Sequence, residues 1–247
     1  MIKIESVNNE KIKEILKLKQ KKYRDEKGLI LVEGYKIFEE IVKADLNIKN
    51  IILTNEVFEK LNLNKFLDKI IIVSSKIAEK LSFQMSSTNF FVVVEKPKEK
   101  FYGGNIAILD NIQDPQNLGA IVRTSVATNI KDIYTLNSVD EYNDKTIRAS
   151  MGNIFKVNIH HIQVCDLKEI CKDKTVYSAN MNGENVFKIS KSQNAFAIIL
   201  GNEGNGVSKE VEEFANKVIA IPMQNKVESL NVAVSFSIIA YHLTNFS

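Results

Sequence analysis

The stretch that decides the fold is an apolar run opening into glycines, Ile198-Ile199-Leu200-Gly201-Asn202-Glu203-Gly204-Asn205-Gly206. A second apolar run stops at a proline, in Ile221-Pro222-Met223. A polar loop then leads into an apolar helix through Glu228-Ser229-Leu230-Asn231-Val232-Ala233. Loops at the carboxyl ends of strands are where α/β proteins hold ligands. Two such loops close together near the C-terminus predict one binding site built from both.

Upstream of this stretch, short apolar runs alternate with helical patterns, which is typical of an α/β domain. We expect strands over residues 105–110, 133–136, 156–162, 175–179, 195–200 and 218–221. A helix is expected over 118–128, capped by Asp114 with Pro115 or equally well by Asn117, and a helix or turn over 146–153. The last helix, 231–245, is apolar on most sides, so it is either buried centrally or shared with another subunit.

The first ninety-odd residues predict a second, smaller α/β domain. Strands are expected over 29–32, 48–53, 69–73 and 90–94, and the first helix over 8–24, ended by Lys27-Gly28. The stretch 95–100 is charged and contains a proline, which predicts a linker between the two domains. We therefore predict two domains, 1–96 and 97–247.

Composition predicts an ordinary globular protein of the cytoplasm. The 247 residues are 45% hydrophobic and 26% charged, and the N-terminus lacks the apolar core of a signal peptide. Cys165 and Cys171 fit neither a disulfide framework nor a zinc site, and reduced thiols are favoured over a chemical role. The three histidines have no metal-ligand spacing with either cysteine, so no metal is expected.

The formal net charge is only +3, but basic residues gather near the N-terminus. Eight of them stand between positions 11 and 27, against Glu14, Asp25 and Glu26: Lys11, Lys13, Lys17, Lys19, Lys21, Lys22, Arg24 and Lys27. Such a cluster suits phosphate binding, and it equally suits the solvated face of a helix in a lysine-rich protein.

The glycine-rich loop by itself does not identify a ligand. Its spacing is not the G-x-G-x-x-G of dinucleotide folds, and the chain has no G-x-x-x-x-G-K-[ST] loop for nucleotide hydrolysis. Ser229 has no histidine at a suggestive spacing, which disfavours a hydrolase triad.

Three motifs, taken together, do identify a family. Asn117-Leu118-Gly119-Ala120-Ile121-Val122-Arg123-Thr124 resembles the first motif of the SpoU (TrmH) RNA 2′-O-ribose methyltransferases. The stretches 200–207 and 221–233 are similar to the second and third, in the same order. More loosely, residues 28–40 resemble the family's N-terminal ribosomal-protein-like module, which docks RNA. The stretch 82–88 departs from the proline- and glycine-containing turn that many relatives have there.

The resemblance implies a SPOUT-class fold, in which the C-terminal segment threads a loop to form a trefoil knot. It implies S-adenosyl-L-methionine as cofactor, no metal, and a homodimer that buries the C-terminal helix. Gly201, Ile221 and Leu230 match the positions whose backbone groups hold the cofactor, with Met223 and Ser229 lining the same pocket. Arg123 matches the catalytic arginine and Asn117 its motif partner, and Glu203, Ser229 and Asn231 match the other polar active-site positions.

The expected reaction is methyl transfer to a ribose 2′-hydroxyl of RNA. Arginine almost never loses its proton in proteins, so we expect Arg123 to bind a phosphate or steady the developing oxyanion rather than act as the base. Ribosomal RNA of the large subunit (23S) is favoured over transfer RNA, and Lys17, Lys19, Lys21, Lys22 and Arg24 form the candidate docking face. The alternatives are a tRNA 2′-O-methyltransferase, a non-catalytic RNA-binding or ribosome-assembly protein of the same fold, and, less favoured, a small-molecule nucleotide-binding enzyme.

Overall fold

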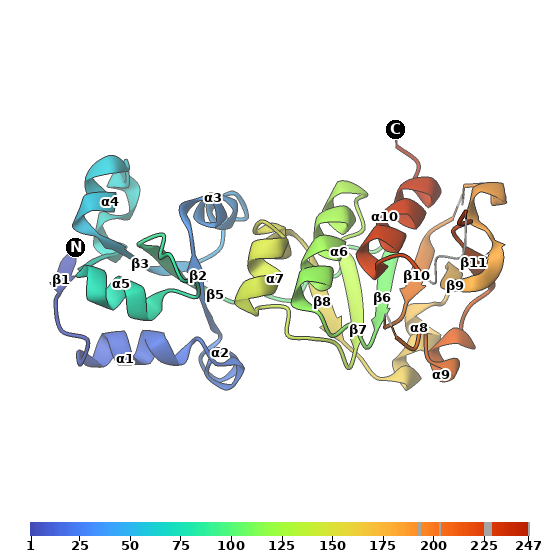
Figure 1. The fold of residues 1–247 in the computed structure, drawn as a ribbon, viewed down its shortest axis with the longest axis horizontal. Helices are drawn as coiled ribbons and strands as arrows, with labels where there is room; N and C mark the ends of the chain where they lie inside the picture. The colour runs from blue at the N-terminus through green and yellow to red at the C-terminus, as the bar shows by residue number, and fades with distance from the viewer. Residues whose placement is uncertain (192–193, 203, 225–228, 247) are drawn as a thin grey trace. The chain divides into compact units, whose positions relative to one another are not determined.

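A computed structural model describes residues 1–191, 194–202, 204–224 and 229–246 (Figure 1). Contacts divide the chain into two compact units, which are described separately below. The first unit contains Met1–Lys98 and the short segment Tyr142–Arg148, and the second contains Glu99–Glu141 and Ala149–Ser247. The boundary after Lys98 falls within the predicted linker. No helix in the described part of the chain has the length and apolar character needed to cross a membrane.

The first unit is built on a five-stranded sheet in the order β1-β4-β3-β5-β2. β3 and β4 run parallel, as do β1 and β4, whereas β5 is antiparallel to both β2 and β3. Its strands are β1 (Ile2–Ile4), β2 (Leu29–Glu33), β3 (Ile48–Thr54), β4 (Ile70–Val73) and β5 (Phe90–Glu95). Its helices are α1 (Glu10–Lys17), α2 (Lys21–Lys27), α3 (Tyr35–Lys43), α4 (Asn55–Lys60), α5 (Ser75–Leu81) and the 3₁₀ helix η1 (Asn64–Lys69). All four predicted strands form, and β1 is an addition.

The predicted helix 8–24 is wrong in one respect, because it breaks into α1 and α2. The amides of Leu18, Lys19 and Gln20 bond to carbonyls three residues back, which tightens and ends the first helix. Leu18 is buried, and Arg24, from the second helix, donates to the carbonyl oxygens of Leu18 and Lys19 at 3.0 and 2.9 Å. A buried guanidinium thus satisfies carbonyls that the broken helix would leave without partners.

The loop 82–88 is organised by the buried carboxylate of Glu33. Its oxygens accept hydrogen bonds from the Ser82 hydroxyl and the Phe83 amide, both at 2.8 Å, and from the Thr88 amide at 3.1 Å. A charged acceptor with several donors stabilises this turn without proline or glycine.

The second unit is built on a six-stranded sheet in the order β11-β9-β10-β6-β7-β8. Every neighbouring pair is parallel. The strands are β6 (Ile106–Asp110), β7 (Asp132–Leu136), β8 (Asn158–His161), β9 (Thr175–Asn185), β10 (Phe196–Leu200) and β11 (Lys217–Ala220). The predicted α/β fold with a mostly parallel sheet is confirmed for this unit, and the knot stays a prediction.

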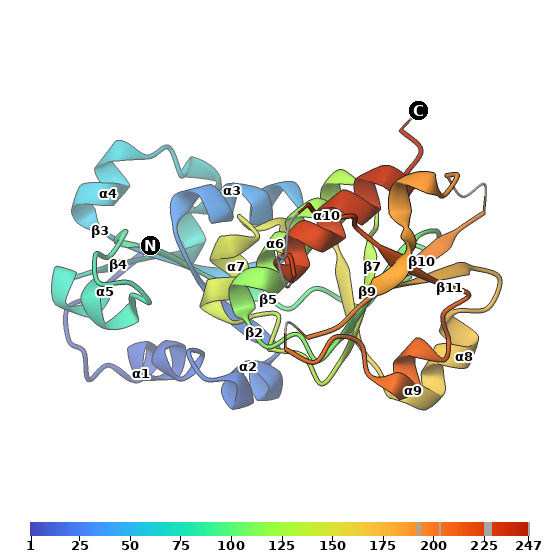
Figure 2. The same ribbon diagram turned by 45° about the vertical axis from the view of Figure 1, so that its right-hand side comes forward.

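Helices cover both faces of this sheet (Figures 1 and 2). Side chains of α8 (Leu167–Ile170) and α9 (Lys209–Glu212) pack on Ile106, Ile108 and Ile199. The alternate residues of these strands face the other layer, where α6 (Pro115–Ala127) and α10 (Val232–Leu243) pack together and α10 contacts β10. The remaining elements of this unit are η2 (Asn153–Lys156), η3 (Val164–Asp166) and η4 (Val186–Lys188). The helix α7 (Asp144–Ala149) belongs, except for its last residue, to the short segment of the first unit.

Two helix caps place the site loops. The Asp114 side chain accepts from the amide of Gln116 at 2.9 Å with Pro115 in the first turn, so Asp114 rather than Asn117 caps α6. Asn231 caps α10 through the amides of Ala233 and Val234. Because Asp114 does the capping, Asn117 is not the cap of α6.

The strand β9 is longer than the prediction of 175–179. It continues to Asn185 and pairs with β11 across a register shift, since Val218 faces Ser178 while Ile219 faces Glu184. A Cβ on Gly183 would lie 2.5 Å from the backbone of Ile219, so this close approach requires glycine. Residues 180–185 are polar and turn-like in sequence, which concealed the strand.

Candidate active site

A cavity of about 320 Å³ lies in the second unit at the carboxyl ends of β10 and β11. The glycine-rich loop after β10, the segment after β11, the residues leading into α10 and the outer part of β9 all line it. Gly201, Ile221, Met223, Ser229 and Leu230 are all among the lining residues. The five residues predicted to hold a cofactor are therefore brought together. A cavity of this volume suits a small-molecule ligand.

The glycine-rich loop folds back on itself directly after the carboxyl end of β10. The Gly206 amide donates to the Asn202 carbonyl at 2.8 Å, and Gly206 has a φ of 68°. A Cβ built on Gly201 would lie 2.0 Å from the carbonyl carbon and oxygen of Gly206. No side chain fits there, so the bare backbone of Gly201 is presented to the cavity.

Two polar side chains tie this loop to the end of β6. The Asn202 amide donates to the Asn111 carbonyl at 3.1 Å and accepts from the Gly204 amide at 2.8 Å. The buried carboxylate of Asp110 accepts from the Ser208 amide at 2.7 Å. Sequence reasoning gave Asn202 and Asp110 no role, because their partners lie more than ninety positions away. Asn180 and Met181 also line the cavity and were missed with the extension of β9.

Asn117 and Asn231 meet across α6 and α10. The Asn231 Nδ2 donates to the Asn117 Oδ1 at 2.9 Å, and the Asn231 Oδ1 is held by the two amides that it caps. Farther along the helices, Thr124 and Ser237 are joined at 2.7 Å, and Ser237 donates to the Ala233 carbonyl. Asn117 and Asn231 are thus anchored next to Ser229 and Leu230, which border the cavity.

Arg123 does not join this group. Its side chain is exposed on α6, and within the described residues it makes neither a hydrogen bond nor an ion pair. Six helical residues turn the direction of a side chain by about 600°, which leaves Arg123 roughly 120° from Asn117 on the helix surface. Among the described residues, no hydrogen bond joins Arg123 to its motif partner Asn117. Glu203 lies outside the described residues.

No group of three His, Cys, Asp or Glu side chains that could hold a metal ion occurs among the described residues. Among the described residues that line the cavity, the polar groups are backbone amides, carbonyls, amide side chains and hydroxyls. Such a set suits a polar organic ligand held by hydrogen bonds better than it suits a cation.

Comparison with known proteins agrees with this geometry. Residues 104–241 match the SpoU rRNA Methylase family, and residues 9–91 match the MRM3-like substrate binding domain. The chain belongs to the SpoU rRNA methylase family. As a member, it is an RNA methyltransferase with a mixed α/β fold.

Relatives of this SpoU-family chain extend over nearly its whole length. A Bacillus subtilis protein named 23S rRNA (guanosine(2553)-2′-O)-methyltransferase RlmP is 29% identical, over 98% of this chain and 99% of its own. The crystal structure of an AdoMet-bound rRNA methyltransferase from Sinorhizobium meliloti superimposes with a TM-score of 0.86 at 23% identity, covering 98% and 97% of the two chains. The structure of a putative TrmH-family RNA methyltransferase from Porphyromonas gingivalis superimposes with a TM-score of 0.84 at 25% identity, covering 97% of this chain and 98% of its own.

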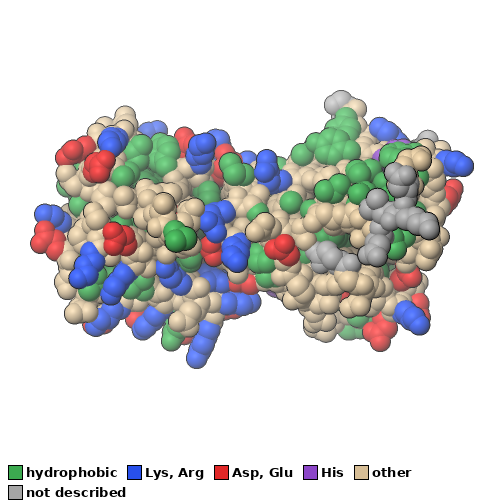
Figure 3. All heavy atoms as spheres, in the orientation of Figure 1, with side chains coloured by type: hydrophobic (Ala, Val, Ile, Leu, Met, Phe, Trp, Pro, Cys, Tyr) green, Lys and Arg blue, Asp and Glu red, His purple; other side chains and the backbone are tan. Residues whose placement is uncertain are grey.

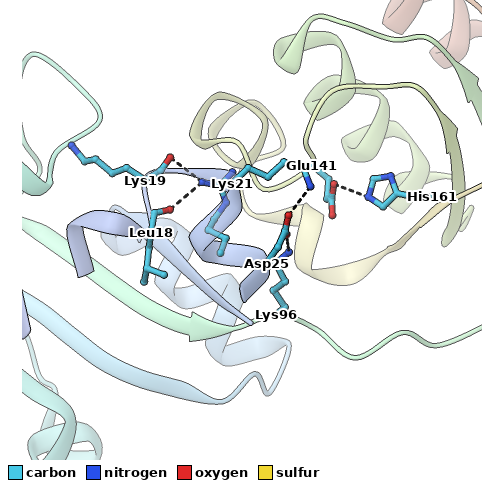
Figure 4. Close-up of polar contacts among 8 residues, drawn as sticks. Leu18, Lys19, Lys21, Asp25, Lys96, Glu141 and His161 are labelled. Carbon is cyan, nitrogen blue, oxygen red and sulfur yellow. Dashed lines mark hydrogen bonds and ion pairs between the residues drawn. The ribbon is translucent and has the colours of Figure 1, made fainter. Parts of the chain in front are cut away.

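In this SpoU-family chain, the basic residues of the first unit divide into two groups. Lysine and arginine side chains gather over α1 and α2 (Figure 3). Lys22 is exposed, whereas Lys17 and Lys21, also exposed, form ion pairs with Glu14 and Asp25. Lys19 and Arg24 differ, because each donates to backbone carbonyls. Figure 4 shows the carbonyl oxygens of Leu18 and Lys19 that accept from Arg24.

Lys19 and Arg24 hold the fold of the first unit together. The Lys19 ammonium donates to the carbonyls of Lys80 and Ser82 at 2.8 and 2.6 Å, and burial lowers its pKa. Arg24 is only 5% exposed. Of the five residues predicted to bind RNA, these two have their donors directed into the protein, and the exposed three are better placed to meet phosphates.

Proposed function

We propose that this chain transfers a methyl group from S-adenosylmethionine to a ribose 2′-hydroxyl of 23S ribosomal RNA. The observation that carries the proposal is the cavity, because residues from all of the loops identified in the sequence line it. Family membership gives methyl transfer to RNA. The choice of 23S RNA over tRNA rests on the Bacillus relative, whose similarity includes the first unit. Modification of ribosomal RNA would place the protein in the cytoplasm.

The lining of the cavity fits the proposed cofactor. Gly201 exposes its backbone, and apolar walls formed by Leu200, Val232 and Ile239 adjoin polar atoms of Asn180 and Ser235. A nucleoside with an amino-acid tail needs this mixture of apolar surface and hydrogen-bonding groups. We assign Gly201, Ile221 and Leu230 to backbone contacts with it, and Met223 and Ser229 to the wall. When bound, S-adenosylmethionine supplies an electrophilic methyl group on a sulfonium.

The chain must orient the ribose oxygen and stabilise its charge. We assign this work to Asn117, Arg123, Ser229 and Asn231, together with Glu203. The fixed orientation of the Asn231 amide supports a positioning role, because its donors and acceptor are already committed to defined partners. Arg123 keeps its proton and would bind an RNA phosphate or the developing oxyanion.

We further propose a homodimer that covers α10. Val234, Ile238 and Tyr241 follow the i, i+4, i+7 spacing of one helix face. Val234 and Tyr241 are 47% and 50% exposed, and Phe246, at 56%, packs on Tyr241 with ring centres 5.3 Å apart. Hydrophobic surface of the second unit is visible over α10 in Figure 3. A contiguous apolar stripe of this kind on an otherwise mixed surface supports an interface between two copies.

In this proposal the two domains have different roles: residues 1–96 bind the RNA, and residues 97–247 catalyse methyl transfer. The test is to map 2′-O-methyl groups on 23S RNA and tRNA from cells with and without the protein, and to assay methyl transfer from labelled cofactor in vitro. Loss of one 23S methyl group in the deletion is expected. A protein that retains no labelled S-adenosylmethionine would be a non-catalytic RNA binder, and a methyl group lost from tRNA would overturn the choice of substrate.

A further inference from the structure

Three aromatic rings form a stack at the edge of the sheet in the second unit, outside the cofactor cavity. The rings of Phe101 and His160 are 4.7 Å apart and nearly parallel, at 8°. His160 is in turn stacked on Tyr134 at 4.8 Å and 25°. Tyr134 and His160 are partners in the pairing of β7 with the edge strand β8, so the sheet fixes the inner two rings.

The outer ring of the stack is open to solvent. His160 is 5% exposed, whereas Phe101 is 74% exposed and the next residue, Tyr102, is 47% exposed. One face of the Phe101 ring is covered by His160. The other face of the Phe101 ring, together with the exposed ring of Tyr102, is therefore open for a flat partner to stack on.

The backbone beneath these rings is held in place. The carboxylate of Asp132, which is 1% exposed, accepts from the amides of Tyr102 and Gly103 at 2.8 and 2.9 Å. Its other oxygen lies 3.2 Å from the His160 Nε2. The Asn158 amide donates to the Lys100 carbonyl. Because these bonds fix both the segment and the ring beneath Phe101, little conformational freedom remains to be lost on binding.

Positive charge accompanies the aromatic pair. The Lys131 ammonium lies 5.1 Å from the centre of the Tyr102 ring, and Lys100 is exposed. In sequence, Phe101-Tyr102 follows Lys96, Lys98 and Lys100, with Glu99 as the one acid among them. The nearby carboxylate of Asp132 is buried and bonded to donors on both oxygens. Aromatic rings combined with lysines are the pattern by which proteins hold unpaired nucleotides.

We propose that Phe101 and Tyr102 are a stacking platform for unpaired bases of the RNA substrate, with Lys131 and Lys100 neutralising the adjoining phosphates. Exposed ring faces accept any base, whereas bases in an A-form duplex are already stacked and inaccessible. The platform therefore selects a single-stranded or bulged segment of the RNA substrate. It rests on the proposed function, because RNA is the substrate in both.

The absence of tryptophan from the chain allows a direct test. The full-length Phe101→Trp variant would carry one fluorophore at the platform, and a base stacked on it quenches its emission. We expect a twelve-nucleotide single-stranded oligoadenylate to quench it and a blunt twelve-base-pair RNA duplex to leave it unchanged. A Phe187→Trp variant is the matched control, because Phe187 is 53% exposed but lies in η4, edge-on to His242 of α10. It should not be quenched by either RNA.

Affinity gives a second measurement. Phe101→Leu keeps the apolar bulk and removes the π face, and it should weaken binding of the oligoadenylate by about 5- to 150-fold, the range expected for one lost base stack. Lys131→Ala should reduce the salt slope of that binding by about 0.7. Three results would each overturn the platform. The first is equal quenching by both RNAs, and the second is an affinity of Phe101→Leu for the oligoadenylate within about twofold of the wild type. The third is that Phe101→Leu converts a dimer to a monomer in sedimentation.

The same proteins separate this inference from the proposed function. Retention of labelled S-adenosylmethionine should be equal in the wild type and in Phe101→Leu, because Phe101 does not line the cavity. A wild type that methylates 23S RNA alongside a Phe101→Leu variant of unchanged RNA affinity would refute the platform alone. A wild type that retains no cofactor would refute the proposed function, whatever the fluorescence shows.

Discussion

The side-chain amide of Asn231 donates a 2.9 Å hydrogen bond to the side-chain oxygen of Asn117, and so joins the start of α10 to the first turn of α6. The same Asn231 accepts hydrogen bonds from the amides of Ala233 and Val234. One residue thus caps a helix and links two motifs that are 114 positions apart. The two roles can be separated by choosing the substitution.

Asn231→Ala should lower both stability and activity. Loss of the cap costs about 1 kcal/mol in the free energy of unfolding. Asn231→Ser should restore most of that stability, because a serine hydroxyl also caps, but it cannot reach Asn117. We expect methyl transfer to be at least about tenfold slower in both variants. A tenfold loss of rate corresponds to an increase of only about 1.4 kcal/mol in the activation free energy, which imperfect positioning of the reacting groups can supply. Thermal unfolding and single-turnover assays measure the two effects, and full activity in Asn231→Ser would argue against a role for the amide pair.

Gly201→Ala should weaken cofactor binding strongly while leaving most of the fold intact. The added methyl would lie 2.0 Å from the Gly206 backbone, so the loop that borders the cavity has to move. Gly204→Ala is the matched control, because its Cβ would meet only the side-chain oxygen of Asn202, at 3.4 Å. Calorimetric titration with S-adenosylmethionine should give at least a hundredfold weaker affinity for Gly201→Ala, equivalent to about 2.7 kcal/mol, and near wild-type affinity for Gly204→Ala. Equal affinities in the two variants would contradict this picture of the loop.

Arg24 and Lys22 should behave in opposite ways, although they stand two positions apart. Arg24→Ala leaves the carbonyls of Leu18 and Lys19 without their buried donor, which costs about 2 to 3 kcal/mol in the free energy of unfolding. Lys22→Ala should leave stability unchanged and reduce the salt slope of RNA binding by roughly one. Denaturant unfolding and RNA binding at several salt concentrations measure these quantities. A stable Arg24→Ala variant with weakened RNA affinity would reverse the assignment.

These contrasts show what the sequence could and could not predict. Gly201, Ile221 and Leu230 were predicted as cofactor contacts because their motifs resemble those of a known family, and the three residues line one cavity. The hydrogen bond from the Asn202 side chain to the Asn111 carbonyl was not predicted, because it depends on β10 lying beside β6. Arg24 looked like part of a basic surface, since sequence does not reveal that the helix breaks at Leu18 and turns the guanidinium inward. The exposed position of Arg123 likewise depends on the packing of α6 and not on its spacing from Asn117.

The ion pairs of Asp25 predict a stability that depends on pH. Burial raises the pKa of this carboxyl, but hydrogen bonds from Lys96 and Lys21 outweigh it and lower the pKa from 3.8 to about 2 (Figure 4). A depressed pKa means that the carboxylate stabilises the native state above about pH 4, and that this stabilisation is lost as the pH falls to about 2. Because the side chain is 44% exposed, solvent screening keeps the effect below about 1 kcal/mol.

Asp25→Asn should therefore be less stable than the wild type at pH 7 and equally stable near pH 2. The difference should shrink in 1 M salt, which screens exposed charges within about 3 Å. Glu26→Gln is the control, since the contact of Glu26 with Lys27 is 4.0 Å long, and it should change stability less. Urea unfolding at several pH values gives the comparison. A stability difference that persists unchanged at pH 2 would mean that Asp25 acts through packing.

The exposed stripe on α10 predicts how the protein assembles and what assembly does for catalysis. Tyr241→Asp places a charge in the centre of the proposed interface, where desolvation would cost several kcal/mol, so sedimentation should show a monomer. Val42→Asp, at a position of similar exposure on α3 in the first unit, should leave the oligomeric state unchanged. Because Arg123 has no partner among the described residues, we expect the monomer to retain S-adenosylmethionine but to lose methyl transfer. An active monomer would show that one copy contains the whole active site, and a Tyr241→Asp dimer would show that the copies meet elsewhere.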